Sequence, residues 1–173
     1  GILIITTVFG QTDSSLVYFT KDISAEGMLK VFSFIEKEVS GKVAFKVHFG
    51  EEGNQNYLPA GMMKPLVKKL DATLVETNVL YVSKRHYTKS HIQLAKDHGF
   101  TYAPIDILDS EGTIEYPATG LKHIKKAIVG SHMNNYDTIV VLSHFKGHKG
   151  AGVGGAIKNV AMGLGAIAGK MAM

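Results

Sequence analysis

The chain has 173 residues, which is enough for one ordinary domain with its own hydrophobic core. Its composition of 45% hydrophobic and 20% charged residues, with a net charge of +4, argues against an intrinsically disordered chain. The absence of cysteine excludes disulfides and thiolate-bound zinc or iron–sulfur centres made by these residues alone.

The first half of the chain alternates short apolar runs with segments of helical period. Strands are expected at residues 2–9, 16–19, 43–49 and 72–76. The first of these also fits the remnant of a signal peptide, although no basic residues precede it. Ser24 fits the N-cap of a helix that runs to Val39 and stops before Gly41. A second helix is expected to start near Pro59 and to run through Leu70.

The second half continues the same alternation. Residues 90–99 predict a helix closed by glycine. Strands are expected at residues 102–105, 105–108, 113–116, 124–129 and 138–142. The turn signal at 109–112 predicts that the second and third of these form a hairpin on the edge of the main sheet. The last segment, 155–173, has helical spacing, but its glycines weaken a helix, so it is expected to need close packing.

This order of elements predicts an α/β fold over residues 1–173, as a single domain. We expect a three-layer sandwich with a mostly parallel, Rossmann-like sheet and a small β-hairpin. No apolar run approaches the roughly 20 residues of a membrane-spanning helix. A cytoplasmic location is expected, with export as the alternative. The apolar C-terminal segment stops without a polar tail, which favours a fragment of a longer chain.

The strongest functional signal is the glycine-rich loop at residues 143–159, which follows the strand expected at 138–142. His144, Lys146 and His148 are the candidate catalytic residues, because imidazole and amine groups can donate and accept protons. The candidate cofactor or anion contacts in this loop are Gly150, Gly152, Gly154, Gly155, Lys158 and Asn159. A glycine hinge that only permits close packing, together with structural histidines, explains the same residues.

A second polar loop follows the strand expected at 43–49. In a parallel sheet the loops after the strands gather at one edge, so His48 and Glu51 can face the histidines of the glycine-rich loop. The candidate metal ligands are His48, Glu51, His144 and His148. The alternative is that the glutamates of this loop are solvated charges.

A third polar loop, residues 77–91, is basic and aromatic. Lys84 and Arg85 are candidate contacts to the carboxylate or phosphate of a cofactor or substrate, because arginine binds such groups through two parallel hydrogen bonds. Taken alone, this loop also fits a solvated charged segment, but three polar loops after three strands favour a shared cleft. His98, His123 and His132 lack such neighbours in the sequence and are expected to be surface or capping residues.

Several segments together resemble the family called domain of unknown function 362. They are Lys-Val-His-Phe-Gly-Glu-Glu-Gly-Asn at 46–54, Glu-Thr-Asn at 76–78, Ala-Lys-Asp-His-Gly-Phe at 95–100, and Ser-His-Phe-Lys-Gly-His at 143–148 with the glycines after it. The resemblance covers about residues 16–173. It implies an α/β domain that family members commonly join to a Cys-rich ferredoxin-type segment, and such members are described as iron–sulfur proteins.

The resemblance also sets a limit on the cofactor. This chain has no cysteine, so an iron–sulfur cluster would require a Cys-rich segment outside these residues. Some members share distant similarity with nickel-dependent lactate racemases, which implies a transition metal as a further possibility. The cofactor itself stays open.

The functional prediction combines these signals. We expect a redox or metal-assisted enzyme domain, an oxidoreductase or a metal-dependent isomerase, that binds a small anionic substrate. No acidic residue follows Asp137, and this local cationic field suits a small anion better than nucleic acid or a membrane. The expected partners are therefore a small anionic ligand and a ferredoxin-type domain or protein. The alternative is a non-catalytic module that binds phosphate or a nucleotide, or that docks an electron carrier.

Overall fold

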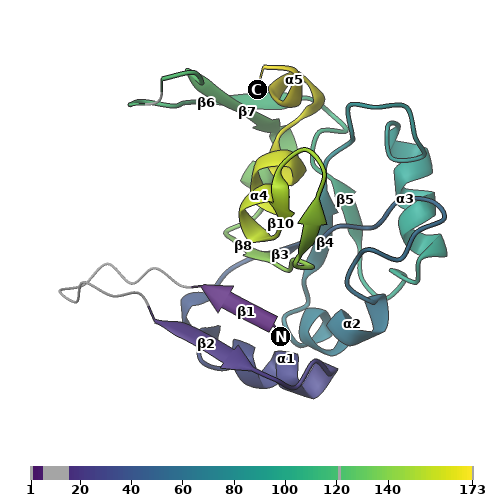
Figure 1. Cartoon of the computed structure of the whole chain (residues 1–173), viewed down its shortest axis with the longest axis vertical. Helices are drawn as coiled ribbons and strands as arrows, with labels where there is room; N and C mark the ends of the chain where they lie inside the picture. Colours follow the sequence, from purple (N-terminus) through teal and green to yellow (C-terminus); the bar gives the residue numbers. More distant parts are fainter. Residues whose placement is uncertain (1, 6–15, 121, 173) are drawn as a thin grey trace.

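Four parallel strands form the central sheet (Figure 1). The computed structural model describes the backbone of residues 2–5 and the whole of residues 16–120 and 122–172. The sheet has the order β5-β4-β3-β8 and consists of β3 (Val43–Lys46), β4 (Thr73–Glu76), β5 (Ile105–Ile107) and β8 (Thr138–Val141). The strands predicted at 43–49, 72–76 and 138–142 are therefore confirmed, whereas the one predicted at 102–105 begins only at its last residue.

Helices flank this sheet. They are α1 (Ala25–Phe32), α2 (Ala60–Lys69), α3 (Thr88–Asp97), α4 (Ala156–Leu164) and α5 (Ile167–Met171). Ser24 caps α1 as predicted, because its Oγ accepts a hydrogen bond of 3.1 Å from Gly27 N. The first helix ends at Phe32 rather than at Val39, and a short 3-10 helix, η1 (Glu36–Glu38), follows it.

Two hydrophobic cores pack on the two faces of the sheet, because side chains alternate between the faces of a strand. Phe45 and Leu74 belong to the larger core, together with buried residues of α1, α2 and α3. Ala44 and Val75 belong to the smaller core, against which Leu164 of α4 packs. The predicted three-layer α/β sandwich is confirmed. Among the helices that the structure describes, none has the length and apolar character needed to cross a membrane.

Three antiparallel strand pairs surround the central sheet. They are β1 (Ile2–Ile5) with β2 (Val17–Thr20), β6 (Thr113–Pro117) with β7 (Lys126–Gly130), and β9 (Lys146–His148) with β10 (Gly152–Gly154). In Figure 1 the first pair lies at the bottom beside α1, and the second lies at the top beside α5. Strands are thus present within the ranges predicted at 2–9, 16–19 and 124–129, while residues 6–9 lie outside the described residues.

The predicted hairpin between residues 105–108 and 113–116 is wrong. β5 pairs in parallel with β4 in the central sheet, and β6 pairs instead with β7. The turn at 109–112 is present, but it leads out of the central sheet into a separate hairpin. Turn residues determine where a chain reverses, whereas the strand that it then pairs with depends on which sheet edge is open.

The C-terminal segment is helical but not continuous. It breaks at Gly165, which forms an isolated bridge with Val129 of β7, and it resumes as α5. The predicted close packing is present at two glycines. A Cβ at Gly163 would lie 2.2 Å from Lys46 Cε, and a Cβ at Gly169 would lie 2.2 Å from the carbonyl oxygen of Ile128. These glycines allow the segment to approach the sheet and β7.

Two of the histidines expected to be surface or capping residues have specific partners, and His98 is the C-cap of α3. His132, in the 3-10 helix η2 (Ser131–Asn135), lies between Asp106 at 2.8 Å and Glu111 at 3.1 Å. The hydrogen bond to Asp106 and the two carboxylates raise the pKa of His132 against a smaller opposing effect of burial. His98 bonds the carbonyl of Phe49 through Nδ1 at 2.7 Å. Both rings therefore connect separate parts of the fold.

Candidate functional site

A buried carboxylate, Glu76, lies at the carboxyl end of β4 and is only 3% exposed. Its Oε1 lies 2.5 Å from Arg85 Nη2 and 3.6 Å from Lys46 Nζ. Its Oε2 accepts a hydrogen bond of 3.2 Å from the backbone N–H of Phe49. Two cations and a backbone donor thus compensate a charge that would be strongly unfavourable if it were buried alone.

Arg85 connects Glu76 to the loop after β3. Its Nη1 donates a hydrogen bond to Glu51 Oε1, which also accepts one from Tyr81 OH. Its Nε lies 3.2 Å from His91 Nε2 on α3. Every nitrogen of the guanidinium therefore has a partner in the protein. An external anion could reach Arg85 only by displacing a carboxylate.

His91 is fully buried beside this pair. Its Nε2 lies 3.2 Å from Arg85 Nε and 3.3 Å from Glu76 Oε2. When Nε2 accepts the hydrogen bond from Arg85, the ring proton of the neutral imidazole is on Nδ1, which is buried and has no hydrogen-bond partner in the described part of the chain. Donation to Glu76 would require the other tautomer or a protonated ring.

Lys46 approaches the same carboxylate from the central strand β3 and is completely buried. Its Nζ donates hydrogen bonds to the carbonyl of Val47 and to Asn159 Oδ1, the latter at 2.7 Å. The Asn159 amide in turn donates to Ser143 Oγ at 3.0 Å and to the carbonyl of Leu142 at 3.2 Å. Lys46 and Asn159 thus join β3, the end of β8 and α4 at one point.

The charges of this cluster shift one another's pKa values. Burial lowers the pKa of Lys46 to about 8, against the opposing effect of Glu76. Burial by itself would raise the pKa of Glu76, but the charges of Arg85 and Lys46 and the hydrogen bond from His48 lower it well below its usual value. The carboxylate is therefore ionised at neutral pH.

The lowered pKa of Lys46 predicts that the protein becomes more stable as the pH rises above about 8. Between that value and the ordinary lysine pKa of 10.5, the unfolded chain keeps a proton that the folded chain has lost. Burial lowers the pKa of Lys170 to about 8 as well, so both lysines contribute. We expect Lys46→Met to reduce the rise in the free energy of unfolding, measured by urea denaturation across this range. The exposed Lys149→Met should leave the rise unchanged, and an equal rise in both variants would contradict the assignment.

His48 forms the partly exposed side of the cluster. Its side chain is 27% exposed, and its Nδ1 lies 3.5 Å from Glu76 Oε1. Burial lowers the pKa of His48 more than Glu76 raises it, so the ring is neutral at physiological pH. A neutral imidazole held by a buried carboxylate can take up a proton from a ligand at its accessible side.

Lys146 lies close enough to this side of the cluster to lower the pKa of His48. Its Nζ donates a hydrogen bond to the carbonyl of Asn56, in the loop after β3. Burial lowers the pKa of Lys146, and the positive charges of Lys158 and Arg85 lower it further. Within the residues that the structure describes, neither Lys146 nor Lys158 has a carboxylate at ion-pair distance.

The remaining predicted site residues lie apart from Glu76 or interact locally. Lys84 is exposed and pairs with Glu52 at 2.5 Å. His148 is exposed on the β9–β10 hairpin, and its Nδ1 accepts hydrogen bonds from the backbone N–H groups of Gly150 and Ala151 at 3.2 and 3.0 Å. His144, between β8 and β9, has a buried Nδ1 without a hydrogen-bond partner in residues 16–120 and 122–172.

The glycine-rich loop is a short β-hairpin followed by a helix. Gly150 and Gly152 are exposed on the hairpin, Gly154 is buried in β10, and Gly155 precedes α4. Gly152 has a positive φ of 69°, which favours glycine at this turn position. Lys158 lies in the first turn of α4, next to the half-buried Asn159.

No group of three or more His, Asp or Glu side chains in the described ranges is placed to share a metal ion. Of the four predicted ligands, His48 contacts Glu76, and Glu51 accepts hydrogen bonds from Arg85 and Tyr81. The metal site on His48, Glu51, His144 and His148 therefore stays a prediction.

A second polar cluster joins the C-terminal helix to the end of β4. Lys170 donates hydrogen bonds to Thr77 Oγ1 at 2.9 Å and to the carbonyl of Asn78. Thr77 Oγ1 also lies 2.9 Å from the carbonyl of Gly165, which precedes α5. These contacts fix α4 and α5 over the edge of the sheet where Glu76 lies.

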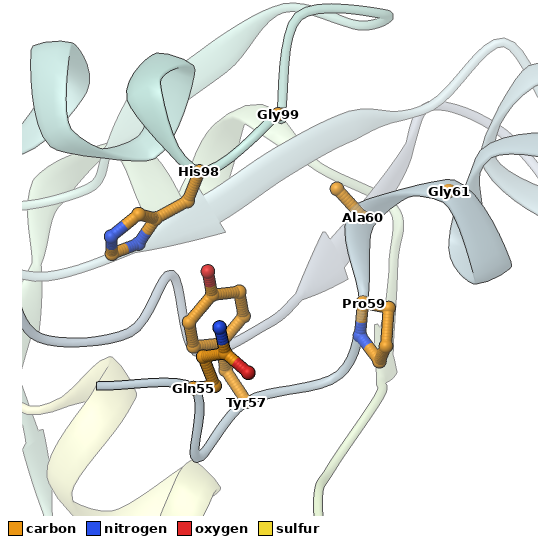
Figure 2. Close-up of a pocket in the computed structure, with 7 residues that line it drawn as sticks. All are labelled: Gln55, Tyr57, Pro59, Ala60, Gly61, His98 and Gly99. Atoms are coloured by element: carbon orange, nitrogen blue, oxygen red, sulfur yellow. The ribbon is translucent and has the colours of Figure 1, made fainter. Parts of the chain in front are cut away.

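A surface cavity of about 390 Å³ that Glu76 does not line is present beside the N-terminus of α2 (Figure 2). The rings of Tyr57 and His98 stack in it at 4.8 Å between centroids. The other lining residues are Gln55, Pro59, Ala60, Gly61 and Gly99. None of these is charged, apart from protonation of the histidine, so this cavity does not match the small anion expected from the sequence.

Sequence reasoning missed the centre of the site. Lys46 has no predicted role in the site, yet it is completely buried in an inner strand of the sheet. Glu76 and His91 were assigned no functional role. The signal in the sequence was a charged residue inside or at the end of an otherwise apolar strand, since a charge in such a position must be paired.

Comparison with known proteins gives one result. The family model of a domain of unknown function (DUF362) matches residues 43–173, which include every residue of the cluster described above. No curated protein and no solved structure matches the chain.

Proposed function

The chain belongs to the DUF362 family, and from the charges at its sheet edge we propose that it is the substrate-binding part of an enzyme that acts on a small anionic molecule. The proposed site lies at the carboxyl edge of β3, β4 and β8, around His48, Glu76 and Lys146. Ligands of open α/β sheets bind at this edge, because the loops after the strands meet there.

The observation that carries the proposal is the charge arrangement. Glu76 and Glu51 of the buried cluster are paired with Lys46 and Arg85 inside it, whereas Lys146 and Lys158 beside it have no carboxylate at ion-pair distance in the described residues. Burial lowers the pKa of Lys146, and the positive charge of Lys158 lowers it further, so the two ammonium groups repel each other. A bound anion would relieve this repulsion.

In this proposal His48 is the proton-transferring group. Glu76 fixes the ring through Nδ1, which leaves Nε2 for a ligand. Such a carboxylate–imidazole pair orients the base and stabilises the imidazolium that forms when the base takes a proton. Arg85 and Lys46 keep Glu76 ionised and act as positioning residues.

Redox or metal chemistry would need a cofactor, either an iron–sulfur cluster or a transition metal, in addition to these residues. An iron–sulfur cluster does not fit this chain, because no cysteine can provide thiolate ligands. A transition metal would need the predicted ligands His48, Glu51, His144 and His148 to converge. The predicted redox or metal-assisted reaction, and the ferredoxin-type partner, therefore remain part of the proposal.

The test is a titration of the protein with phosphate and with succinate, followed by NMR of backbone amides and of the His48 ring. We expect saturable shifts of Lys146 and Lys158 amides and a rise in the pKa of His48, since a nearby anion favours the imidazolium. Lys146→Gln should weaken binding. Lys149→Gln, an exposed lysine on the same hairpin, is the matched control.

The same titration distinguishes the proposed enzyme from the alternative, a non-catalytic binding module. The hairpin is open on one side, because a Cβ at Gly147 or Gly152 would have no other atom within 4 Å in the described structure. This favours a non-catalytic module in which backbone N–H groups bind phosphate. Phosphate binding that moves hairpin amides but leaves the His48 pKa unchanged would support that module, and no saturable binding would reject both functions.

A further inference from the structure

The helix α4 has its polar and apolar sides partly reversed, because Leu164 packs against the smaller core while other apolar residues of the helix are exposed. A surface helix ordinarily buries its apolar stripe and exposes its polar side. On α4 the exposed positions are Ala156, Ile157, Val160 and Ala161, and the side chain of Ile157 is 88% exposed. The polar Asn159 faces inward, where its Oδ1 accepts the hydrogen bond from Lys46.

The reversal has a physical cause within the fold. Lys46 is buried beneath α4 and needs a polar partner, so the helix turns Asn159 and the bare backbone at Gly163 toward it. Because this side faces the sheet, the side of α4 that carries Ile157 and Val160 faces solvent. Exposing these apolar side chains to water does not stabilise the folded domain.

Two residues of the neighbouring loop and hairpin extend this surface. Phe145 is 76% exposed and lies against the start of α4, since a Cβ at Gly155 would be 3.4 Å from its Cδ2. Val153 of β10 is 54% exposed, and β10 contacts α4 (Figure 1). The α4 surface, as we call it, consists of Phe145, Val153, Ala156, Ile157, Val160 and Ala161.

The charges around the α4 surface all have one sign. Lys146, Lys149 and Lys158 belong to the same hairpin and helix, and no acidic residue follows Asp137 in the sequence. No carboxylate in the described residues pairs with any of these three lysines. An apolar centre with a cationic rim is complementary to an apolar surface with an acidic rim.

We infer that the α4 surface docks a protein partner that presents apolar side chains flanked by carboxylates. A second copy of this chain would bring like charges together at the rim, which disfavours self-association. A membrane surface is also disfavoured, because interfacial helices present several bulky residues such as Trp, Phe and Leu. On the α4 surface Phe145 is the single aromatic residue, and α4 itself exposes two alanines, one valine and one isoleucine.

The experiment uses defined probes. A labelled helical peptide with leucines on one face and glutamates beside them is titrated with the whole chain and followed by fluorescence anisotropy. A second peptide has lysines in place of the glutamates. We expect saturable binding of the acidic peptide only, weakened by added salt, and weakened about tenfold or more by Ile157→Glu. Ile23→Glu changes another exposed isoleucine, 66% exposed outside the α4 surface, and should bind as the unchanged chain does.

The remaining outcomes overturn the inference. Equal binding of both peptides, or binding that Ile157→Glu does not weaken, would show that the contact is not the one proposed. A dimer in light scattering that Ile157→Glu dissociates would assign the surface to self-association, and binding to phosphatidylserine vesicles without peptide binding would assign it to a membrane. Ile157 lies outside the proposed anion site, so loss of peptide binding with intact phosphate binding distinguishes this inference from the proposed function.

Discussion

Glu76→Gln is expected to reduce the free energy of unfolding by about 3–5 kcal/mol, because it leaves the buried Lys46 without a carboxylate partner and leaves Arg85 with Glu51 alone. Arg85 Nη2 lies 2.5 Å and Lys46 Nζ lies 3.6 Å from the carboxylate oxygen that would lose its charge. The substitution keeps the size of the side chain, so the lost free energy of unfolding comes from the missing charge rather than from altered packing. Urea denaturation at neutral pH measures it.

The matched control is Glu115→Gln. Glu115 pairs with Lys126 at 2.7 Å on the exposed β6–β7 hairpin, and both side chains are about half exposed. Such a surface pair contributes about 0–1 kcal/mol. If both variants lost the same stability, the buried cluster would not be the ionised network described above.

The stability of the same variant at acid pH provides a second test. The folded-state pKa of Glu76 is lowered well below the ordinary value of 4.5, so its charge stabilises the fold above that value. This contribution is lost as the pH falls through the folded-state pKa. The stability difference between the unchanged chain and Glu76→Gln should therefore shrink on acidification, and a difference that stays constant would contradict the assignment.

Gly130→Ala is expected to reduce the free energy of unfolding by about 1–3 kcal/mol, as overpacking in an interior does. A Cβ at Gly130 would lie 2.3 Å from the carbonyl carbon of Leu108 and 2.6 Å from Asp109 N. Both are backbone atoms at the end of β5, which cannot move as a flexible side chain can. The methyl group would push β7 away from the central sheet.

Gly61→Ala is the control for this substitution. Gly61 lies in α2, and a Cβ there has no other atom within 4 Å in the described structure. Alanine is favoured over glycine in a helix, so stability should be unchanged or slightly higher. Thermal denaturation of both variants measures the difference in stability. A Gly130→Ala protein as stable as the unchanged chain would mean that β7 does not pack against the end of β5.

The sequence determined the layers of this protein. Apolar runs such as the one before Ser143 and helical periods such as the one after Ser24 are local properties of the chain, and their alternation predicted the parallel sheet correctly. The same reasoning placed polar loops at one edge of the sheet. His48 and Arg85 do meet there, because the ends of adjacent parallel strands are close in space.

Tertiary structure decided which of these polar residues meet and what they contact. Glu76 and Lys46 are 30 positions apart in sequence, and their pairing depends on the register of β3 with β4, which places Lys46 opposite Val75. The hairpin partner of β6 and the outward apolar side of α4 were not predictable for the same reason. Local propensity determines which segments form helices and strands, whereas pairing, burial and the partners of a buried charge depend on contacts between segments that are distant in the chain.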